Sequence, residues 1–182
     1  MSDRPRIGVS ACLLGERVRY DGGDKRDAWL VDVLAPAVEW VPVCPEVEAG
    51  LGTPREPMNL GRRADGRIVL ITDRIRDDLT DTMASYAARE VDALAASRLD
   101  GYVLKSGSPS CGLDVAVHAL PDVPASRPAG EDRAMGVFAA ALTSRFPDLP
   151  VADERQLADP AARERFVARV FAHHRARAIR QR

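Results

Sequence analysis

The chain has 182 residues, enough for one domain with a substantial core, and its 46% hydrophobic and 29% charged residues are typical of an ordinary globular protein. A net charge of −1 gives no electrostatic reason to expect nucleic acid or an anionic membrane as a partner. The sequence has no signal-peptide core near its start and no run of about 18 apolar residues, so we expect a cytoplasmic protein whose thiols stay reduced.

Strand-like and helix-like segments alternate along the chain. Short apolar runs predict strands at residues 6–14, 39–44, 67–72, 101–106 and 149–153. Apolar residues at helical spacing predict helices at 27–38, 77–98 and 131–146, and a last helix with Asp159 as N-cap and Pro160 at its first position. We therefore predict an α/β fold of a single domain, residues 1–182, with a mostly parallel sheet flanked by helices in a Rossmann-like three-layer arrangement.

Three cysteines lie where predicted strands end. Cys12 and Cys44 end the first and second strands, and Cys111 lies in the loop after the strand at 101–106. Ligands of open α/β sheets bind beyond the carboxyl ends of the strands, so we expect all three thiols at the ligand-binding edge. An odd number of cysteines in a reducing compartment favours metal binding or catalysis over a structural disulfide.

This convergence leaves several kinds of site open. Three thiolates are typical of a soft metal centre, either zinc or an iron–sulfur cluster, although the sequence lacks the closely spaced cysteine pairs of structural zinc sites. An accessory protein that carries a metal or sulfur without turnover could use the same thiols. A hydrolase with Cys111 as nucleophile would need a histidine base. We expect His118 to be an ordinary strand residue, and His173 and His174 to lie on the solvated face of the basic last helix.

Three motifs, "SACLLG…VRYDGG", "PVCPE" and "KSGSPSCG", resemble those of the TudS-type thiouracil desulfurases, and the resemblance extends over nearly the whole chain. It implies a single desulfurase-like domain with a [4Fe-4S] cluster held by Cys12, Cys44 and Cys111. It also implies Glu46 as the base and Ser108 as its helper. The implied reaction is a non-redox removal of sulfur from thiouracil or a related small thioamide, with the substrate sulfur bound to the open iron.

Other residues near the motifs are candidates for substrate contact. We predict such contacts at Ser10, Arg19, Tyr20 and Ser106, and Arg17 is a further cation that could reach a pyrimidine. At "TPREPMNL", Glu56 stands where the resemblance leads us to expect an apolar residue or proline, so this substrate loop departs from the pattern. We expect the basic C-terminus to be a solvated helix end, whose charge suits the helix dipole, rather than an RNA-binding surface.

Overall fold

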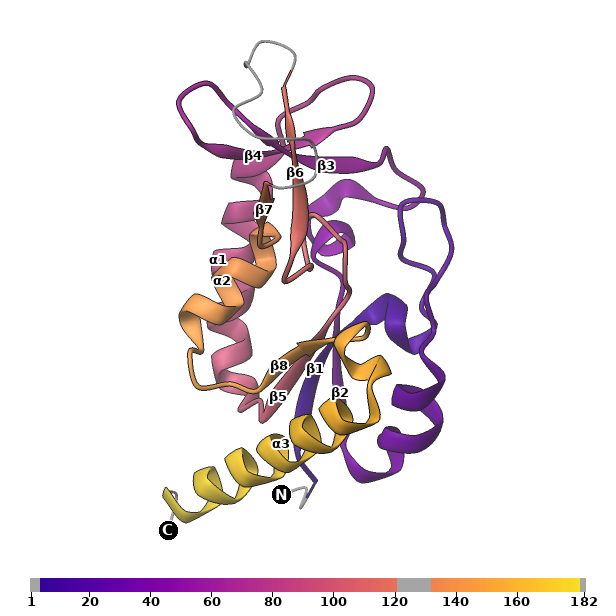
Figure 1. Ribbon diagram of the computed structural model, residues 1–182, viewed down its shortest axis with the longest axis vertical. Coiled ribbons are helices and arrows are strands. Elements are labelled where there is room, and N and C mark those ends of the chain that lie inside the picture. Colours follow the sequence, from indigo (N-terminus) through magenta and orange to yellow (C-terminus); the bar gives the residue numbers. More distant parts are fainter. Residues whose placement is uncertain (1–3, 121–131, 181–182) are drawn as a thin grey trace.

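The computed structural model describes residues 4–120 and 132–180, whose strands form two sheets (Figure 1). The first has four parallel strands in the order β2 (Glu39–Val43), β1 (Arg6–Ser10), β5 (Gly101–Leu104) and β8 (Val151–Asp153). The second has the order β4 (Ile68–Thr72), β3 (Met58–Arg62), β6 (Val115–Ala119) and β7 (Arg133–Ala134). It is mixed, because β3 pairs parallel with β6 and antiparallel with β4.

Helices cover both faces of the parallel sheet. The helices α1 (Thr80–Ser97) and α2 (Val137–Arg145) pack against each other along one side of the molecule and reach from one sheet to the other (Figure 1). The helix α3 (Pro160–Arg180) crosses the other face. Short helical turns complete the chain: η1 (Ala11–Leu14), η2 (Trp29–Leu34), η3 (Ala35–Ala37), η4 (Val47–Leu51) and η5 (Gln156–Ala158).

The buried strand β5 shows how the three layers are held together. Tyr102 and Leu104 belong to the hydrophobic cluster formed with α1 and α2, whereas Val103 belongs to the cluster on the α3 side. Successive side chains of a strand point to opposite faces, so a continuous apolar run such as "GYVL" fills two cores. The predicted α/β fold with helices on both faces of a parallel sheet is confirmed.

Several predicted element boundaries were wrong. The strand predicted at 67–72 is present as β4, whereas the strand predicted at 6–14 ends at Ser10, where a 3-10 turn begins. The segment 27–38 forms a π turn and a 3-10 turn instead of one regular helix. The helix predicted from residue 131 begins at Val137, after β7, and residue 131 itself lies outside the described residues. Apolar spacing locates buried residues, but it does not report where backbone hydrogen bonds change partner.

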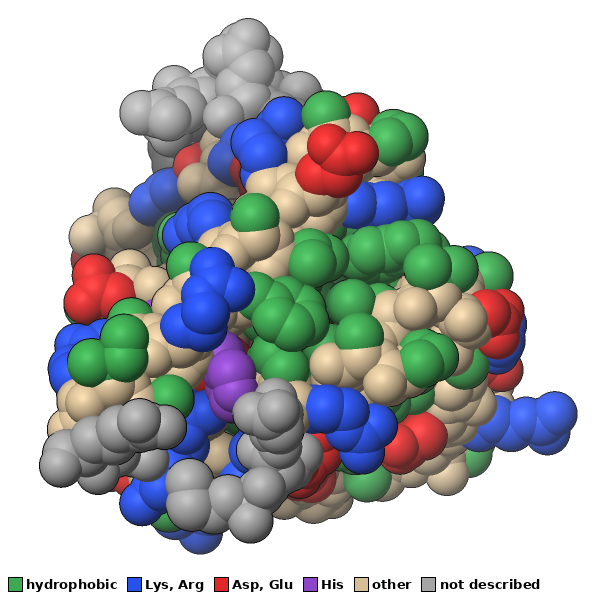
Figure 2. Space-filling model, turned by 90° about the horizontal axis from the view of Figure 1, so that it is seen from below, with side chains coloured by type: hydrophobic (Ala, Val, Ile, Leu, Met, Phe, Trp, Pro, Cys, Tyr) green, Lys and Arg blue, Asp and Glu red, His purple; other side chains and the backbone are tan. Residues whose placement is uncertain are grey.

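The C-terminal helix is fastened to the sheet by a buried carboxylate. Asp100, just before β5, is fully buried and accepts two hydrogen bonds from Arg177, one from the Arg6 backbone N–H and one from His174. His173 lies 3.4 Å from the same carboxylate. The prediction that His173 and His174 lie on a solvated face was therefore wrong, because a buried acid must be paired. On the face seen from below, basic side chains lie around a patch of hydrophobic side chains (Figure 2).

Removing this acid should loosen α3. Breaking a fully buried ion pair costs about 3–5 kcal/mol of stability. Because Arg177 keeps 22% of its side chain exposed, we expect Asp100→Ala to lower the free energy of unfolding by about 2 kcal/mol. Burial alone would raise the pKa of Asp100, but the bonds from Arg177, the Arg6 N–H and His174 hold it below its usual value. This stabilisation is therefore present above the unfolded pKa and disappears as the pH falls through the folded one.

Urea unfolding at neutral and acidic pH measures this effect. The difference in free energy of unfolding between Asp100→Ala and the wild type should become smaller in acid. Glu39→Ala is the matched control, because its pair with Arg6 is over a third exposed on each side and should contribute less than about 1 kcal/mol. Equal losses of unfolding free energy in the two variants would contradict the special role of Asp100.

No helix among the described residues is long and apolar enough to cross a membrane.

Candidate active site

A pocket of about 360 Å³ opens where the carboxyl ends of β1, β2 and β5 meet. Its walls come from the loops that follow these strands. The lining includes Ser10, Cys12, Arg19, Tyr20, Lys25, Cys44, Glu46, Arg55, Met58, Lys105, Ser106, Ser108 and Cys111. The structure thus brings together three cysteines that are separated by up to about a hundred residues of sequence, at the sheet edge where α/β folds bind ligands.

All three cysteines are free thiols that influence one another. Burial and the neighbouring Cys44 raise the pKa of Cys12 to about 11, while Lys105 and Arg19 oppose that rise. Burial, followed by the charge of Glu46, raises the pKa of Cys111 well above its usual value. Three desolvated thiols in one pocket are poor anions by themselves, and a bound metal centre would supply the positive charge that favours their thiolate forms.

This donor set fits an iron–sulfur cluster. Thiolates are soft ligands, and three of them would leave one iron of a four-iron cluster without a protein ligand. Among the described side chains, no three His, Cys, Asp or Glu are grouped so that they could hold a single metal ion.

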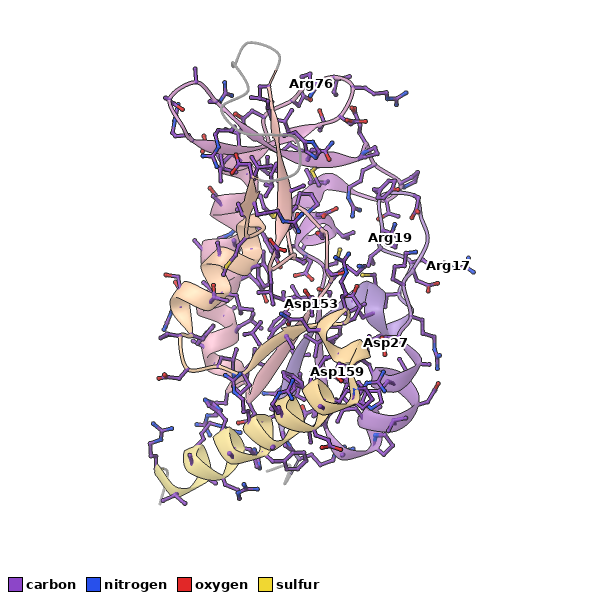
Figure 3. The ribbon with its side chains drawn as sticks, in the orientation of Figure 1. Arg17, Arg19, Asp27, Arg76, Asp153 and Asp159 are labelled. Atoms are coloured by element: carbon purple, nitrogen blue, oxygen red, sulfur yellow. The ribbon has the colours of Figure 1, made fainter. Side chains whose placement is uncertain are left out.

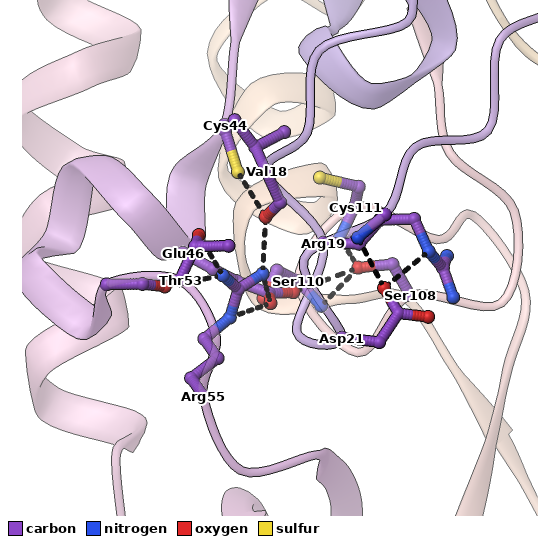
Figure 4. A network of polar contacts seen from close by, with 12 residues as sticks. Val18, Arg19, Asp21, Cys44, Glu46, Thr53, Arg55, Ser108, Ser110 and Cys111 are labelled. Carbon is purple, nitrogen blue, oxygen red and sulfur yellow. Dashed lines mark hydrogen bonds and ion pairs between the residues drawn. The ribbon is translucent and has the colours of Figure 1, made fainter.

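Glu46 is held between an arginine and two serines (Figure 4). Arg55 donates from Nε to Glu46 Oε2 at 2.8 Å, and a second, shorter bond comes from its Nη2. Ser108 and Ser110 donate their hydroxyls to the other oxygen, Oε1, at 3.3 and 3.0 Å. Oε2 thus binds Arg55, and Oε1 faces the loop at residues 105–112, called the serine loop below.

The segment "KSGSPSCG" places Ser108 beside Glu46. The Ser108 hydroxyl oxygen accepts the backbone N–H groups of Ser110 and Cys111 at 3.2 and 3.1 Å, which closes the turn. Gly107 has φ +68°, and a Cβ on Gly112 would stand 2.8 Å from the Ser108 carbonyl oxygen. The glycines are therefore required by the backbone, while Ser108 lines the pocket and Ser110 is fully buried outside it.

The comparisons with known proteins agree with this geometry. A family model described as 2-thiouracil desulfurase matches residues 7–154. The chain belongs to the 2-thiouracil desulfurase family. A solved structure of a [4Fe-4S]-dependent thiouracil desulfidase, TudS, superposes with a TM-score of 0.64 at 30% identity, covering 87% of this chain and 96% of that one. The uncharacterised protein YbbK of Bacillus subtilis is 30% identical over 110 residues, 58% of this chain and 72% of YbbK.

The residues predicted to contact substrate occupy different positions. Arg19 and Tyr20 line the pocket, whereas Arg17 points away from it (Figure 3). Ser10 also lines it, but its hydroxyl accepts the backbone N–H of Lys105 at 2.9 Å. The Ser106 hydroxyl donates to Glu154 at 2.5 Å. The hydroxyls of Ser10 and Ser106 therefore serve the loop in this structure.

Glu56, where the sequence departs from the family pattern, lies away from the cysteine pocket. Its carboxylate accepts the backbone N–H groups of Arg74 and Ile75 and does not line the cavity. The neighbouring Arg55 lines the pocket and pairs with Glu46, and sequence reasoning missed this residue. Its signal was its position in "TPREPMNL", the segment expected to form the substrate loop.

Lys105 is the second pocket residue that sequence reasoning missed. Its ammonium group donates to Glu154 at 2.6 Å and to the carbonyl and hydroxyl oxygens of Ser106, which pins the start of the serine loop to the end of β8. All three of its protons are used, so it contributes charge and order rather than a free donor.

The histidines lie elsewhere. His118 lines a neighbouring cavity, and His173 and His174 contact Asp100. None of the three lines the cysteine pocket, so Cys111 has no histidine base there. The geometry thus disfavours the cysteine-hydrolase alternative.

Proposed function

We propose that this chain is a [4Fe-4S]-dependent, non-redox desulfurase that removes sulfur from 2-thiouracil or a related small thioamide. The observation that carries the proposal is the meeting of three free thiols with the Glu46–Ser108 pair in one pocket. Cys12, Cys44 and Cys111 would hold the cluster, and when bound it supplies a soft Lewis acid for the thiocarbonyl sulfur. Residues 1–182 act as one desulfurase-like domain in the cytoplasm, where thiols stay reduced.

The protein's own residues handle water and its protons. The overall reaction replaces C=S with C=O and releases H2S, so water supplies the oxygen and both protons and no electrons are exchanged. Glu46 accepts a proton from the attacking water at Oε1, the oxygen that does not bind Arg55 and that accepts the hydroxyls of Ser108 and Ser110. Ser108 lies between this oxygen and the pocket, where its hydroxyl orients the water or the substrate. Arg19 and Tyr20, which stack with 5.3 Å between guanidinium and ring centroid, offer a contact surface for a planar base.

Turnover in isotopically labelled water tests this proposal. Protein reconstituted with iron and sulfide under anaerobic conditions should convert 2-thiouracil to uracil without added reductant. Each uracil should carry one oxygen-18 atom from the water, and one sulfide should be released per uracil. Mass spectrometry of the product and a sulfide assay measure both, and protein stripped of iron is the control.

Two outcomes would overturn the proposal. A strict need for a reductant would rule out non-redox hydrolysis. Iron or sulfide binding with no sulfide released from any of a panel of small thioamides, 2-thiouracil included, would favour the alternative, an accessory protein that carries a metal or sulfur without turnover.

A further inference from the structure

The backbone around Cys44 adopts a helix-capping arrangement. Cys44 follows β2 and precedes the turn that begins at Pro45, and the backbone N–H of Glu48 donates to its carbonyl oxygen at 3.0 Å. Because the helical residues begin at Pro45, just before η4, Cys44 takes the position that a serine or aspartate usually takes at a helix start, with proline in the favoured next position.

The Glu48 side chain binds the backbone of Cys44 at this cap. Its Oε1 accepts the backbone N–H of Cys44 at 2.9 Å, a bond like that of a capping box, although Glu48 stands four residues after Cys44 instead of three. The contact fixes the direction of the Cys44 backbone and so the direction of its side chain. In this structure the thiol points to the Val18 carbonyl oxygen, 3.7 Å away, which Arg55 also binds at 3.0 Å.

Tyr86 on α1 holds Glu48 in place. Its hydroxyl donates to Glu48 Oε2 at 2.6 Å, a short bond typical of a charged acceptor. Burial, then the bond to Glu48, raises the pKa of Tyr86 far above its usual value, so the hydroxyl keeps its proton and remains a donor. The Tyr86 ring is buried in the core, with 5% of its surface exposed, whereas Glu48 is a surface residue whose carboxylate would otherwise rotate freely.

Cys44 is the cysteine that most needs such support. Cys12 and Cys111 are buried, but Cys44 is only partly buried. The N–H of Cys111 is held by Ser108 within the same loop, whereas the N–H of Cys44 depends on an acid anchored by a helix far along the chain. The partners that orient metal ligands typically change metal affinity by about 10–100-fold when they are removed.

We propose that Tyr86 and Glu48 are positioning residues that hold the Cys44 backbone so that its sulfur can bind the cluster. This inference rests on the proposed function, because it takes Cys44 to be a cluster ligand. Two hydrogen bonds then connect α1 to the pocket: one from the Tyr86 hydroxyl to Glu48, and one from the Cys44 N–H to Glu48.

Tyr86→Phe tests the inference with little change in shape. In the holoprotein, iron should be lost to a chelator about tenfold faster than in the wild type, because the cap on Cys44 loosens. In the apoprotein, the Cys44 amide proton should exchange with solvent about tenfold faster in an NMR measurement, which does not depend on the cluster. Glu48→Ala should have both effects, and Glu48→Gln, which keeps an oxygen acceptor for the Cys44 N–H, should restore most of the protection.

Tyr102→Phe is the matched control, since it removes another buried phenol hydroxyl, one that has no hydrogen-bond partner among the described residues. It should leave Cys44 exchange and iron loss within twofold of the wild type. Unchanged Cys44 exchange in both Tyr86→Phe and Glu48→Ala would overturn the inference, as would equal acceleration by Tyr102→Phe. If the wild type takes up no iron, the proposed function fails, and amide exchange still decides whether Tyr86 and Glu48 hold Cys44.

Discussion

Replacing Cys12, Cys44 or Cys111 with serine is expected to remove most of the iron and all measurable desulfurisation. A serine hydroxyl ionises far less readily than a thiol and binds iron poorly, so one lost thiolate leaves the cluster on two ligands. The sequence has three cysteines in total, so no spare thiol could take over. Iron and sulfide per chain, together with the visible spectrum of anaerobically purified protein, measure the loss.

The control separates loss of the cluster from loss of the fold. Each serine variant is compared with the wild type as apoprotein, where the near-isosteric exchange should leave the melting temperature similar. A variant that keeps full iron and sulfide would show that its cysteine is not a ligand. Stoichiometric zinc in anaerobically prepared wild type would contradict the cluster itself.

Glu46→Gln is expected to lower turnover by about 10²–10⁴ while the iron content and the spectrum stay near normal. Glutamine keeps the shape of the side chain and an oxygen for Arg55, but it cannot take a proton from water. Ser108→Ala should also slow turnover without loss of iron, because the Ser108 hydroxyl bonds to Glu46 Oε1 and lines the pocket. Steady-state rates of sulfide release measure both variants.

Glu56→Gln is the matched acid control, because Glu56 bonds to the backbone of the loop at residues 73–77 and does not line the pocket. Its rate should equal that of the wild type. Activity of Glu46→Gln within about threefold of the wild type would remove Glu46 from the mechanism. If Glu46→Gln loses its iron, the carboxylate supports the cluster instead of acting as the base.

The parallel sheet was predictable because its signals are local. The runs "RIGVS", "GYVL" and "LPVAD" are apolar over consecutive residues, as expected for strands buried on both faces. The mixed sheet was not predicted, because its strand β3, "MNLGR", has neither an apolar run nor a clear alternation. This strand is fixed by its pairing with β4 and β6, which follow it in the sequence, and such pairing leaves no local pattern.

The sequence by itself determined that three cysteines follow three strands, and it supplied the motifs that connect them to thiouracil desulfurases. Only the tertiary structure decided which polar groups surround them. It paired Glu46 with Arg55, joined Tyr86 through Glu48 to Cys44, and drew the terminal helix onto Asp100. Strand and helix periodicity comes from the backbone repeat and can be read within a few residues. A buried polar partner depends on where distant segments meet, and only the folded chain brings those segments together.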